Sequence, residues 1–538
     1  MNSIVLIVSI FIIFVLAYRF YGKILESLWG VDASRPTPAI TQNDGVDYVP
    51  AKNILVLFGH HFSSIAGAGP VIGPIMACLV WGWVPAMLWV VLGSILFGGI
   101  HDYGALMISI KEKGSSIGDI ASSTISKKAR FIFSVFIWFT LILIVAVFSY
   151  LTADTFAAKP EIVIPSLGLI PIAFLFGVGI YRFKYPLALM TIISLSALAG
   201  LVFLGNLAPV NLGYNAQNLW IIVLLAYCFF ASIIPVNLLL QPRDYLSSFL
   251  LFVGILIGII GVFVTHPATK TPAFISLNSS QGSLWPMMFI TIACGAISGF
   301  HSLISSGTTS KQIANETDAK KIGFGGMLVE AFLAALVIII FSSSFSLPEF
   351  HAHQLMNTNP ISLFGESFGN VTKIFLGPWG TFIALFVLNA FILTTLDSAT
   401  RIARYVTEEI LIIKNRFLST LAVVVFAGSL ALAHDKGGLP IWKKIWPLFG
   451  ASNQLIGALA LIVIACWLLQ KNKSGFLYAL LPALFMLITS LTALSIKIPS
   501  QWRNQEFLLV IISTILIITT LLLISEVFIV FNNRRRHG

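Results

Sequence analysis

Long apolar stretches alternate with short polar ones along almost the whole chain. Most of these stretches approach or exceed the roughly 20 residues that a helix needs to cross a bilayer. The pattern predicts about fifteen membrane-spanning helices, at residues 4–21, 54–80, 84–110, 130–152, 162–181, 185–205, 216–239, 244–265, 285–306, 323–347, 373–399, 417–433, 446–469, 475–495 and 507–531. The expected fold is therefore an all-α polytopic membrane protein.

Composition agrees with this prediction. Apolar residues make up 57% of the chain and charged residues only 10%, whereas soluble domains carry roughly 25% charge. The four cysteines lie singly inside apolar stretches and form no CxxC pair. We interpret Cys78, Cys228, Cys294 and Cys466 as small core residues, with no disulfide framework and no cysteine metal site. The net charge of +11 comes from basic residues at the ends of apolar stretches, so we expect no nucleic-acid partner.

The basic residues predict the orientation in the membrane. With the N-terminus outside, 24 of the 32 lysine and arginine residues fall on the cytoplasmic side, as the positive-inside rule requires. We therefore expect a periplasmic N-terminus, residues 4–21 as a retained helix, and a cytoplasmic C-terminus with Arg534, Arg535 and Arg536. The exceptions are Lys436, Lys443 and Lys444, which this topology places outside.

The second apolar stretch contains an unusual run of polar and helix-breaking residues from Gly59 to Pro74. Pro70 and Pro74 remove backbone donors and the glycines lower helix propensity. We expect the helix to unwind near mid-membrane and to line a substrate site, because freed backbone groups are tolerated there only at a cavity. The alternative is a helix-packing face of small residues. The substrate-binding candidates in this run are Ser63, Ser64, Gly67, Ala68 and Gly69.

Titratable groups recur at a similar predicted depth in four different spans. They are His60, His61, His101, Asp102, His301 and Glu330. Charged groups inside a bilayer are costly and usually face a polar interior. Three interpretations stay open for this layer: structural hydrogen bonding, a proton-coupling relay, and a divalent metal site formed by His60, His61, His101, Asp102 and His301.

Hydroxyl residues follow His301 at helical spacing. Ser305 and Thr309 are four residues apart and would share one helix face, with Thr308 beside them. Hard cations take oxygen ligands of this kind, so these three residues are candidates for Na⁺. Hydroxyls that bond back to their own helix are the alternative.

A second break is expected at Pro235, in the span at 216–239. A half-helix N-terminus there would attract an anion, and we assign Asn237 to the substrate site. Charged residues close the neighbouring spans, and we interpret them as a gate or as structural ion pairs. These gate candidates are Arg243, Asp244, Asp397 and Arg401.

Two broken helices of opposite direction, five spans apart, predict an inverted five-plus-five repeat with the substrate between the breaks. The first repeat would cover residues 54–205 and the second 216–400. A first helix and cytoplasmic loop at 1–53 and further helices at 401–538 would flank this core. By analogy, the arrangement is like that of LeuT and the amino acid/polyamine/organocation superfamily.

Longer motifs carry a family resemblance. They are Arg35-Pro36-Thr37-Pro38-Ala39, Asp44-Gly45-Val46-Asp47-Tyr48, Gly59 to Pro74, Ile100-His101-Asp102-Tyr103, Gln241 to Leu246, Ser298 to Ile313, Leu396 to Arg401 and Phe449 to Gln454. In these the chain resembles the carbon starvation protein A (CstA) family of bacterial inner-membrane transporters. The resemblance implies proton-driven uptake of pyruvate or small peptides during carbon starvation.

The expected function is a secondary active symporter, not an enzyme, that imports a small carboxylate-bearing nutrient. No nucleotide-binding loop is present to energise primary transport. The coupling ion is H⁺ or Na⁺, a divalent metal is the only cofactor considered, and membrane lipid is the expected surrounding. A passive anion or ion channel and an intramembrane metal-binding protein are the alternatives. Pyruvate versus peptide, and the oligomeric state, stay open.

Overall fold

The computed structural model describes residues 1–45, 47–236, 238–279, 281–356, 359–412, 415–433, 442–471 and 475–537, with backbone alone for 442–444 and 531–537. In its first half the helices are α1 (Ser3–Trp29), α2 (Pro38–Thr41), α3 (Ile54–Ile65), α4 (Gly69–Trp81), α5 (Trp83–Gly93), α6 (Gly99–Lys111), α7 (Ile117–Thr124), α8 (Lys127–Ala158), α9 (Val163–Gly177), α10 (Leu187–Leu207), α11 (Ala216–Ile233) and α12 (Leu240–Thr265).

In the second half they are α13 (Leu284–Thr291), α14 (Gly299–Gly307), α15 (Gly325–Ser344), α16 (Leu347–Leu355), α17 (Pro360–Leu376), α18 (Trp379–Leu411), α19 (Arg416–Ala431), α20 (Trp442–Gln470), α21 (Phe476–Arg503) and α22 (Phe507–His537). Short π-helical or 3-10 turns join several of them. The strands β1 (Asn278–Ser279) and β2 (Gly282–Ser283) form one small antiparallel hairpin. The predicted helical class is confirmed.

Thirteen helices in the described part of the chain are long and apolar enough to cross a membrane. Two other predicted spans form shorter helices. The span at 285–306 is split into α13 and α14, and the span at 417–433 is the 16-residue helix α19. The predicted span at 373–399 starts six residues later, as α18, because the residues before it form the separate helix α17.

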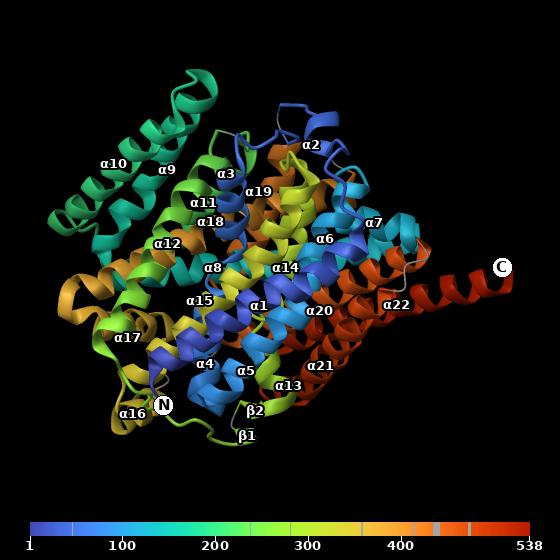
Figure 1. Ribbon diagram of the computed structural model, residues 1–538. Helices are drawn as coiled ribbons and strands as arrows, with labels where there is room; N and C mark the ends of the chain where they lie inside the picture. The colour runs from blue at the N-terminus through green and yellow to red at the C-terminus, as the bar shows by residue number, and fades with distance from the viewer. Residues whose placement is uncertain are drawn as a thin grey trace.

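The chain termini lie on opposite faces of the molecule (Figure 1). The amino group of Met1 donates a hydrogen bond to Thr269 Oγ1 (2.9 Å), in the connection between α12 and the hairpin β1–β2. Near the other end, Glu526 of α22 accepts hydrogen bonds from Ser126 (3.0 Å) and Lys128 (2.7 Å). The loop after α1 reaches that second face, where the Gln42 side chain donates to the Lys113 carbonyl. The predicted number of crossings, fifteen, is odd and would place the termini this way.

A buried carboxylate fixes the loop after α1 to the second face. Glu316 is fully buried and accepts hydrogen bonds from Arg35 (3.2 Å) and Lys111 (2.6 Å). These three residues come from the loop before α2, the end of α6 and the segment before α15. The ion pairs therefore hold together three segments that are remote in sequence.

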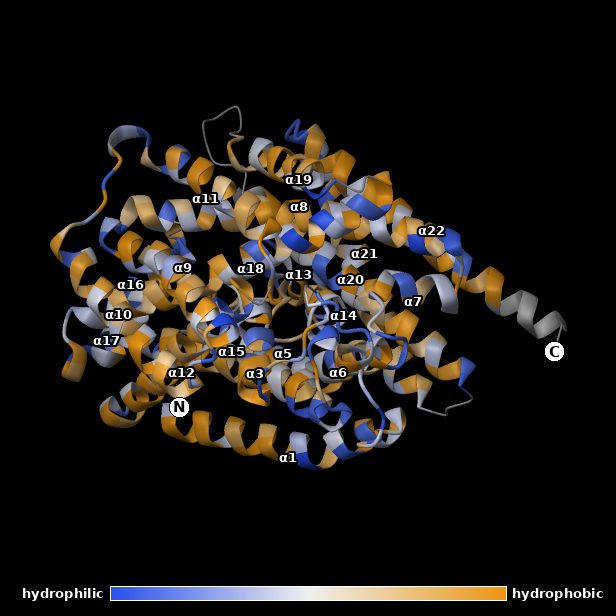
Figure 2. Ribbon diagram, turned by 90° about the horizontal axis from the view of Figure 1, so that it is seen from above, coloured by the Kyte–Doolittle hydropathy of each residue, from blue (hydrophilic) through white to orange (hydrophobic). Residues whose placement is uncertain are grey.

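The degree of burial separates the centre of the bundle from its lipid-facing rim. In the α3–α4 span, 83% of the most apolar 18-residue window is buried, against 17% in α10. The hairpin of α9 and α10 stands apart at one side of the bundle (Figure 1), and Figure 2 shows polar positions gathered near α6 and α14. Exposed apolar residues such as Phe203 and Leu207 on α10 suit contact with lipid.

Candidate functional site: two facing helix breaks and a buried charged layer

The first break in the bundle is the one predicted at Gly59–Pro74. Helix α3 ends at Ile65 and α4 begins at Gly69, with irregular backbone between them. Helix α18 satisfies the carbonyls that the break leaves free, because Thr394 Oγ1 donates to Ser63 O (2.7 Å) and Thr395 Oγ1 donates to Ser64 O (3.3 Å). The expectation of an unwound helix is confirmed.

The second break lies elsewhere than predicted. Pro235 falls in the connection between α11 and α12, where it ends one helix and interrupts none. Asn237, assigned to the substrate site, lies outside the described residues. The second interrupted span is instead α13–α14, which is irregular at residues 292–298.

Small residues let the two breaks touch. Gly69, the first residue of α4, lies directly against Cys294 in the second break. A side chain at Gly295 would stand 3.8 Å from Pro70 on α4, and one at Gly67 would stand 2.5 Å from Thr395 Oγ1. The glycines that were interpreted as a sign of unwinding therefore also serve close packing, which was the alternative considered for them.

Asp102 joins two of the predicted histidines beside the second break. Its carboxylate accepts hydrogen bonds from Nδ1 of His101 and from Nδ1 of His301, each at 2.7 Å. On the other edge of its ring, His301 Nε2 lies 3.3 Å from Glu330 Oε2 on α15. All four side chains are fully buried. This part of the predicted titratable layer is thus one contiguous chain across α6, α14 and α15.

The adjacent histidines of α3 point to different partners. His61 Nδ1 bonds Thr309 Oγ1 (2.9 Å), whereas His60 Nδ1 bonds Asp244 Oδ2 (2.7 Å). The same carboxylate accepts a hydrogen bond from Ser64 (3.3 Å), and the Asp244 carbonyl accepts one from Ser63 (2.8 Å). Both serines proposed for substrate therefore already have partners on α12.

The predicted gate residues form a buried ion-pair network next to His60. Arg243, which is 1% exposed, donates to Asp244 (2.9 Å) and, through both terminal nitrogens, to Asp397 on α18. Tyr227 also bonds both Arg243 (2.6 Å) and Asp397 (2.7 Å). Arg401 stands apart from this network and donates to backbone carbonyls at the end of α11.

The proposed sodium ligands do not share a helix face, because α14 ends at Gly307 and Thr309 starts a 3-10 turn. Ser305 Oγ contacts the Asp102 carbonyl at 3.5 Å, and Thr308 Oγ1 donates to the Ile304 carbonyl of its own helix (3.0 Å). Thr308 thus bonds back to its own helix, which was the alternative considered for these hydroxyls.

A cavity of about 720 Å³, here called the polar vestibule, lies beside the second half of the interrupted span. Its lining includes Tyr48, Asp119, Ser306, Lys311 and Tyr405. Ser306 follows His301 by five residues on α14, or about 7 Å along the helix axis. A second cavity, of about 30 Å³ and almost wholly apolar, lies on the other side of Gly67. Of these two cavities, the polar vestibule is the one with room for a small solute.

Lys311 is the notable cation of the polar vestibule, and the sequence analysis did not single it out. Its Nζ lies 5.3 Å from the centre of the Tyr48 ring and 5.8 Å from that of Tyr405. It makes no ion pair with any residue that the structure describes, whereas Asp119 is paired to Arg130 (2.8 Å). Burial lowers the pKa of the Lys311 ammonium. A lone lysine after a serine- and threonine-rich helix end was the available signal.

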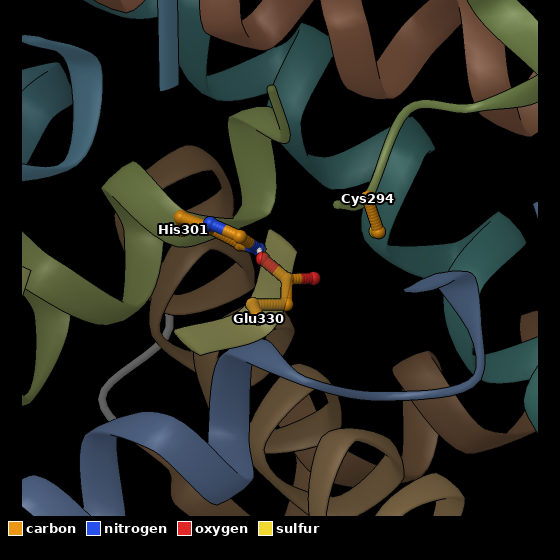
Figure 3. A group of neighbouring side chains, drawn as sticks. All are labelled: Cys294, His301 and Glu330. Atoms are coloured by element: carbon orange, nitrogen blue, oxygen red, sulfur yellow. Dashed lines mark ion pairs between the residues drawn. The ribbon is translucent and has the colours of Figure 1, made fainter. Parts of the chain in front are cut away.

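One further group could hold a metal ion. Ligand atoms of Cys294, His301 and Glu330 all lie within 4.8 Å of one another, and the three residues are buried (Figure 3). Of the predicted metal ligands, only His301 belongs to this group. Asp102 lies behind it, and His60 and His61 bond residues elsewhere. Cys294 had been interpreted as a small core residue.

Comparison with known proteins identifies the family. The family model described as carbon starvation protein CstA matches residues 2–375 and 356–493. The chain belongs to this family. The Bacillus subtilis peptide transporter CstA is 33% identical over 547 residues, covering 91% of this chain and 89% of its own. The Escherichia coli pyruvate/proton symporter BtsT is 30% identical over 583 residues, covering 90% of this chain and 80% of its own.

Solved structures agree on the fold. A mutant of the Eremococcus coleocola manganese transporter superimposes with a TM-score of 0.54 at 13% identity, over 92% of this chain and 99% of its own. The structure of MhsT in complex with L-phenylalanine superimposes with a TM-score of 0.52 at 13% identity, over 82% of this chain and 99% of its own. These are structures of the LeuT fold. The family and its relatives, which are named as transporters, make the protein a multi-pass membrane transporter and not an enzyme.

Proposed function

We propose that the protein is a proton-coupled symporter that imports a small carboxylate-bearing solute, pyruvate or a short peptide. The observation that supports this best is the contact of two helix breaks beside a buried chain of carboxylates and imidazoles. Interrupted helices that meet near mid-membrane are the usual place for solute and coupling ion in transporters of this kind. The relatives named for pyruvate/proton symport and for peptide transport support the same solute class.

Lys311 is the residue that we propose to receive the solute carboxylate on the way to the cytoplasm. It is a cation without an ion-pair partner among the described residues, and the polar vestibule around it has room for a small solute. Tyr48 and Tyr405 hold the ammonium group between their rings. Asp47, Asp119, Glu408 and Glu409 also line the cavity, but none of them forms an ion pair with Lys311. A solute carboxylate would supply that pair and leave by the same opening.

The coupling proton is assigned to the chain Asp102–His301–Glu330. One imidazole between two carboxylates can pass a proton from one side of its ring to the other. Protons suit this place better than sodium, because the hydroxyls of Ser305 and Thr308 contact backbone carbonyls and are not gathered around a common centre. Glu330 lies at the far end of the chain, on α15, and we assign it as the proton acceptor.

We also revise the proposed repeats. If each half of the core begins with its interrupted span, the first half still begins at residue 54, with α3, and the second begins with α13–α14 instead of at residue 216. The α9–α10 hairpin and α1 then lie outside the core. The predicted orientation, with the N-terminus periplasmic and the loop after α1 cytoplasmic, would make the polar vestibule the cytoplasmic exit.

The deciding experiment uses purified protein in liposomes. Labelled pyruvate and a labelled dipeptide are tested for counterflow, and then for accumulation under an imposed inward proton gradient. Glu330→Gln should retain counterflow and lose gradient-driven accumulation, because the solute path remains and the proton acceptor is removed. Glu349→Gln, on the exposed helix α16, is the matched control and should behave as the natural protein.

Three results would contradict the proposal. Currents without saturable counterflow would indicate a passive channel. Accumulation by Glu330→Gln that equals that of Glu349→Gln under the same gradient would remove the proton assignment at α15. A sodium gradient that drives uptake at constant pH would move the coupling site elsewhere.

A further inference from the structure

Three side chains with different donor atoms converge at the junction of the second break with α15. Cys294 comes from the irregular segment, His301 from the first turn of α14 and Glu330 from the second turn of α15. The thiol sulfur, an imidazole nitrogen and a carboxylate oxygen lie within 4.8 Å of one another (Figure 3). The three residues lie on three separate segments of the backbone, so no local sequence motif predicts that they meet.

Apart from the Cys294 sulfur, the donor atoms at this junction are buried and lack hydrogen bonds. His301 Nε2 and both carboxylate oxygens of Glu330 have no hydrogen-bond partner in the described part of the chain. An unsatisfied buried polar group costs about 1–3 kcal/mol, and here three such atoms point toward one place. The 3.3 Å approach of Nε2 to one Glu330 oxygen offsets part of this cost only when a proton lies between them, on the imidazole or on the carboxyl group.

The surroundings orient these donors for a ligand. Asp102 holds His301 by its other ring nitrogen at 2.7 Å, an arrangement of carboxylate and histidine that recurs behind metal-bound imidazoles. The Cys294 sulfur contacts Ser298 Oγ (3.5 Å) and the Asn453 amide (3.8 Å), which fix it beside the break. The side chains that would bind a ligand and the side chains that orient them are therefore both present.

We propose that Cys294, His301 and Glu330 bind a transition-metal ion of the zinc class. Thiolate and imidazole favour Zn²⁺ or Co²⁺ over Mg²⁺ and Ca²⁺, which prefer oxygen ligands alone. Bonds of about 2.0–2.3 Å to a tetrahedral ion would bring the donor atoms somewhat closer than their present separation. Three protein ligands leave a fourth position for water or solute.

A bound ion would tie the irregular segment to α15. The proposed transport cycle requires movement at this junction, so the ion should slow solute uptake by holding the three segments in one arrangement. This consequence rests on the proposed function, whereas the binding of the metal does not.

Cobalt titration of metal-stripped protein in detergent tests the site without a transport assay. We expect one Co²⁺ per chain and a near-ultraviolet charge-transfer band, which appears only when a thiolate is a ligand. Cys294→Ser should lose that band, while Cys466→Ser, at a buried cysteine on α20, should retain it. Asp102→Asn should weaken cobalt binding about 10- to 100-fold through the orientation of His301.

The outcomes separate the two proposals. Natural protein that accumulates solute under a proton gradient yet shows no charge-transfer band at saturating Co²⁺ overturns the metal site and leaves symport intact. A band in protein without solute uptake supports the metal site and overturns symport. A band that survives in Cys294→Ser and disappears in Cys466→Ser also overturns the site. Gel filtration of each variant shows that it is folded before the titration.

Discussion

The ion-pair network of Arg243 gives a sharp test of charge balance inside the bundle. One buried guanidinium faces the carboxylates of Asp244 and Asp397. Arg243→Met removes the only cation and leaves two buried anions close together. Breaking a buried ion pair in this way costs about 3–5 kcal/mol, mainly because a charge remains uncompensated.

Asp397→Asn should be milder. Asp244 still lies 2.9 Å from the guanidinium, so one cation faces one anion, and the asparagine oxygen can still accept a hydrogen bond. The free energy of unfolding should then fall by the value of the charged hydrogen bonds that are lost, about 1.5–3 kcal/mol. In the double variant Arg243→Met/Asp397→Asn a single carboxylate remains, held by His60 and Ser64. Its destabilisation should be smaller than the sum of the single effects by about 0.5–3 kcal/mol.

The assay is unfolding in mixed micelles by increasing sodium dodecyl sulfate, followed by circular dichroism of the purified variants. We expect the natural protein to be the most stable, followed by Asp397→Asn and then by Arg243→Met. The double variant should be more stable than the sum of the two single effects predicts. Additive effects would show that Arg243 and Asp397 do not interact in solution. If Asp397→Asn were less stable than Arg243→Met, the charge-balance reasoning itself would be refuted.

Three further predictions concern other parts of the molecule. Gly67→Ala should destabilise the protein and impair uptake, because its Cβ would lie 2.5 Å from Thr395 Oγ1; Gly200→Ala, at an uncrowded site in α10, should stabilise it by about 0.5–1 kcal/mol in the same unfolding assay. Glu316→Gln should lower the midpoint of thermal aggregation and expose the loop after α1 to proteolysis, since two basic groups lose their buried counter-charge; unchanged cleavage would contradict this. Solute affinity in counterflow should fall as pH rises through the lowered pKa of Lys311, because the neutral amine no longer attracts a carboxylate, and Lys311→Arg should abolish that fall; an identical pH profile in both proteins would remove Lys311 from the solute path.

The sequence predicted the spans and the first break well, because both depend on local composition. An apolar stretch of about 20 residues can satisfy its backbone in lipid only as a helix. Pro70, which has no backbone N–H to donate, stands in a glycine-rich run that favours a break there. The second break was misplaced for the same reason. Pro235 is a strong local signal, whereas the irregular segment at 292–298 has no proline and depends on packing against α4.

The polar layer shows the same limit at the level of side chains. Depth along a helix can be counted from sequence, and the groups at Asp102, His301 and Glu330 do meet. Which face of a helix each group occupies relative to its neighbours cannot be counted, so His60 and His61 were grouped although they have separate partners. Residues from irregular segments, such as Cys294 and Lys311, had no helical register from which their position could be inferred.

The separation of the chain ends has a practical consequence for anyone who attaches reporters to this protein. Met1 lies beside Thr269 on one face and Glu526, near the end of α22, beside Ser126 on the other. Two halves of a split fluorescent protein fused to the ends would sit in different compartments and stay dark, whichever way the protein inserts. Moving one half into an insertion after Gln42 should restore fluorescence, because that loop shares its face with the end of α22.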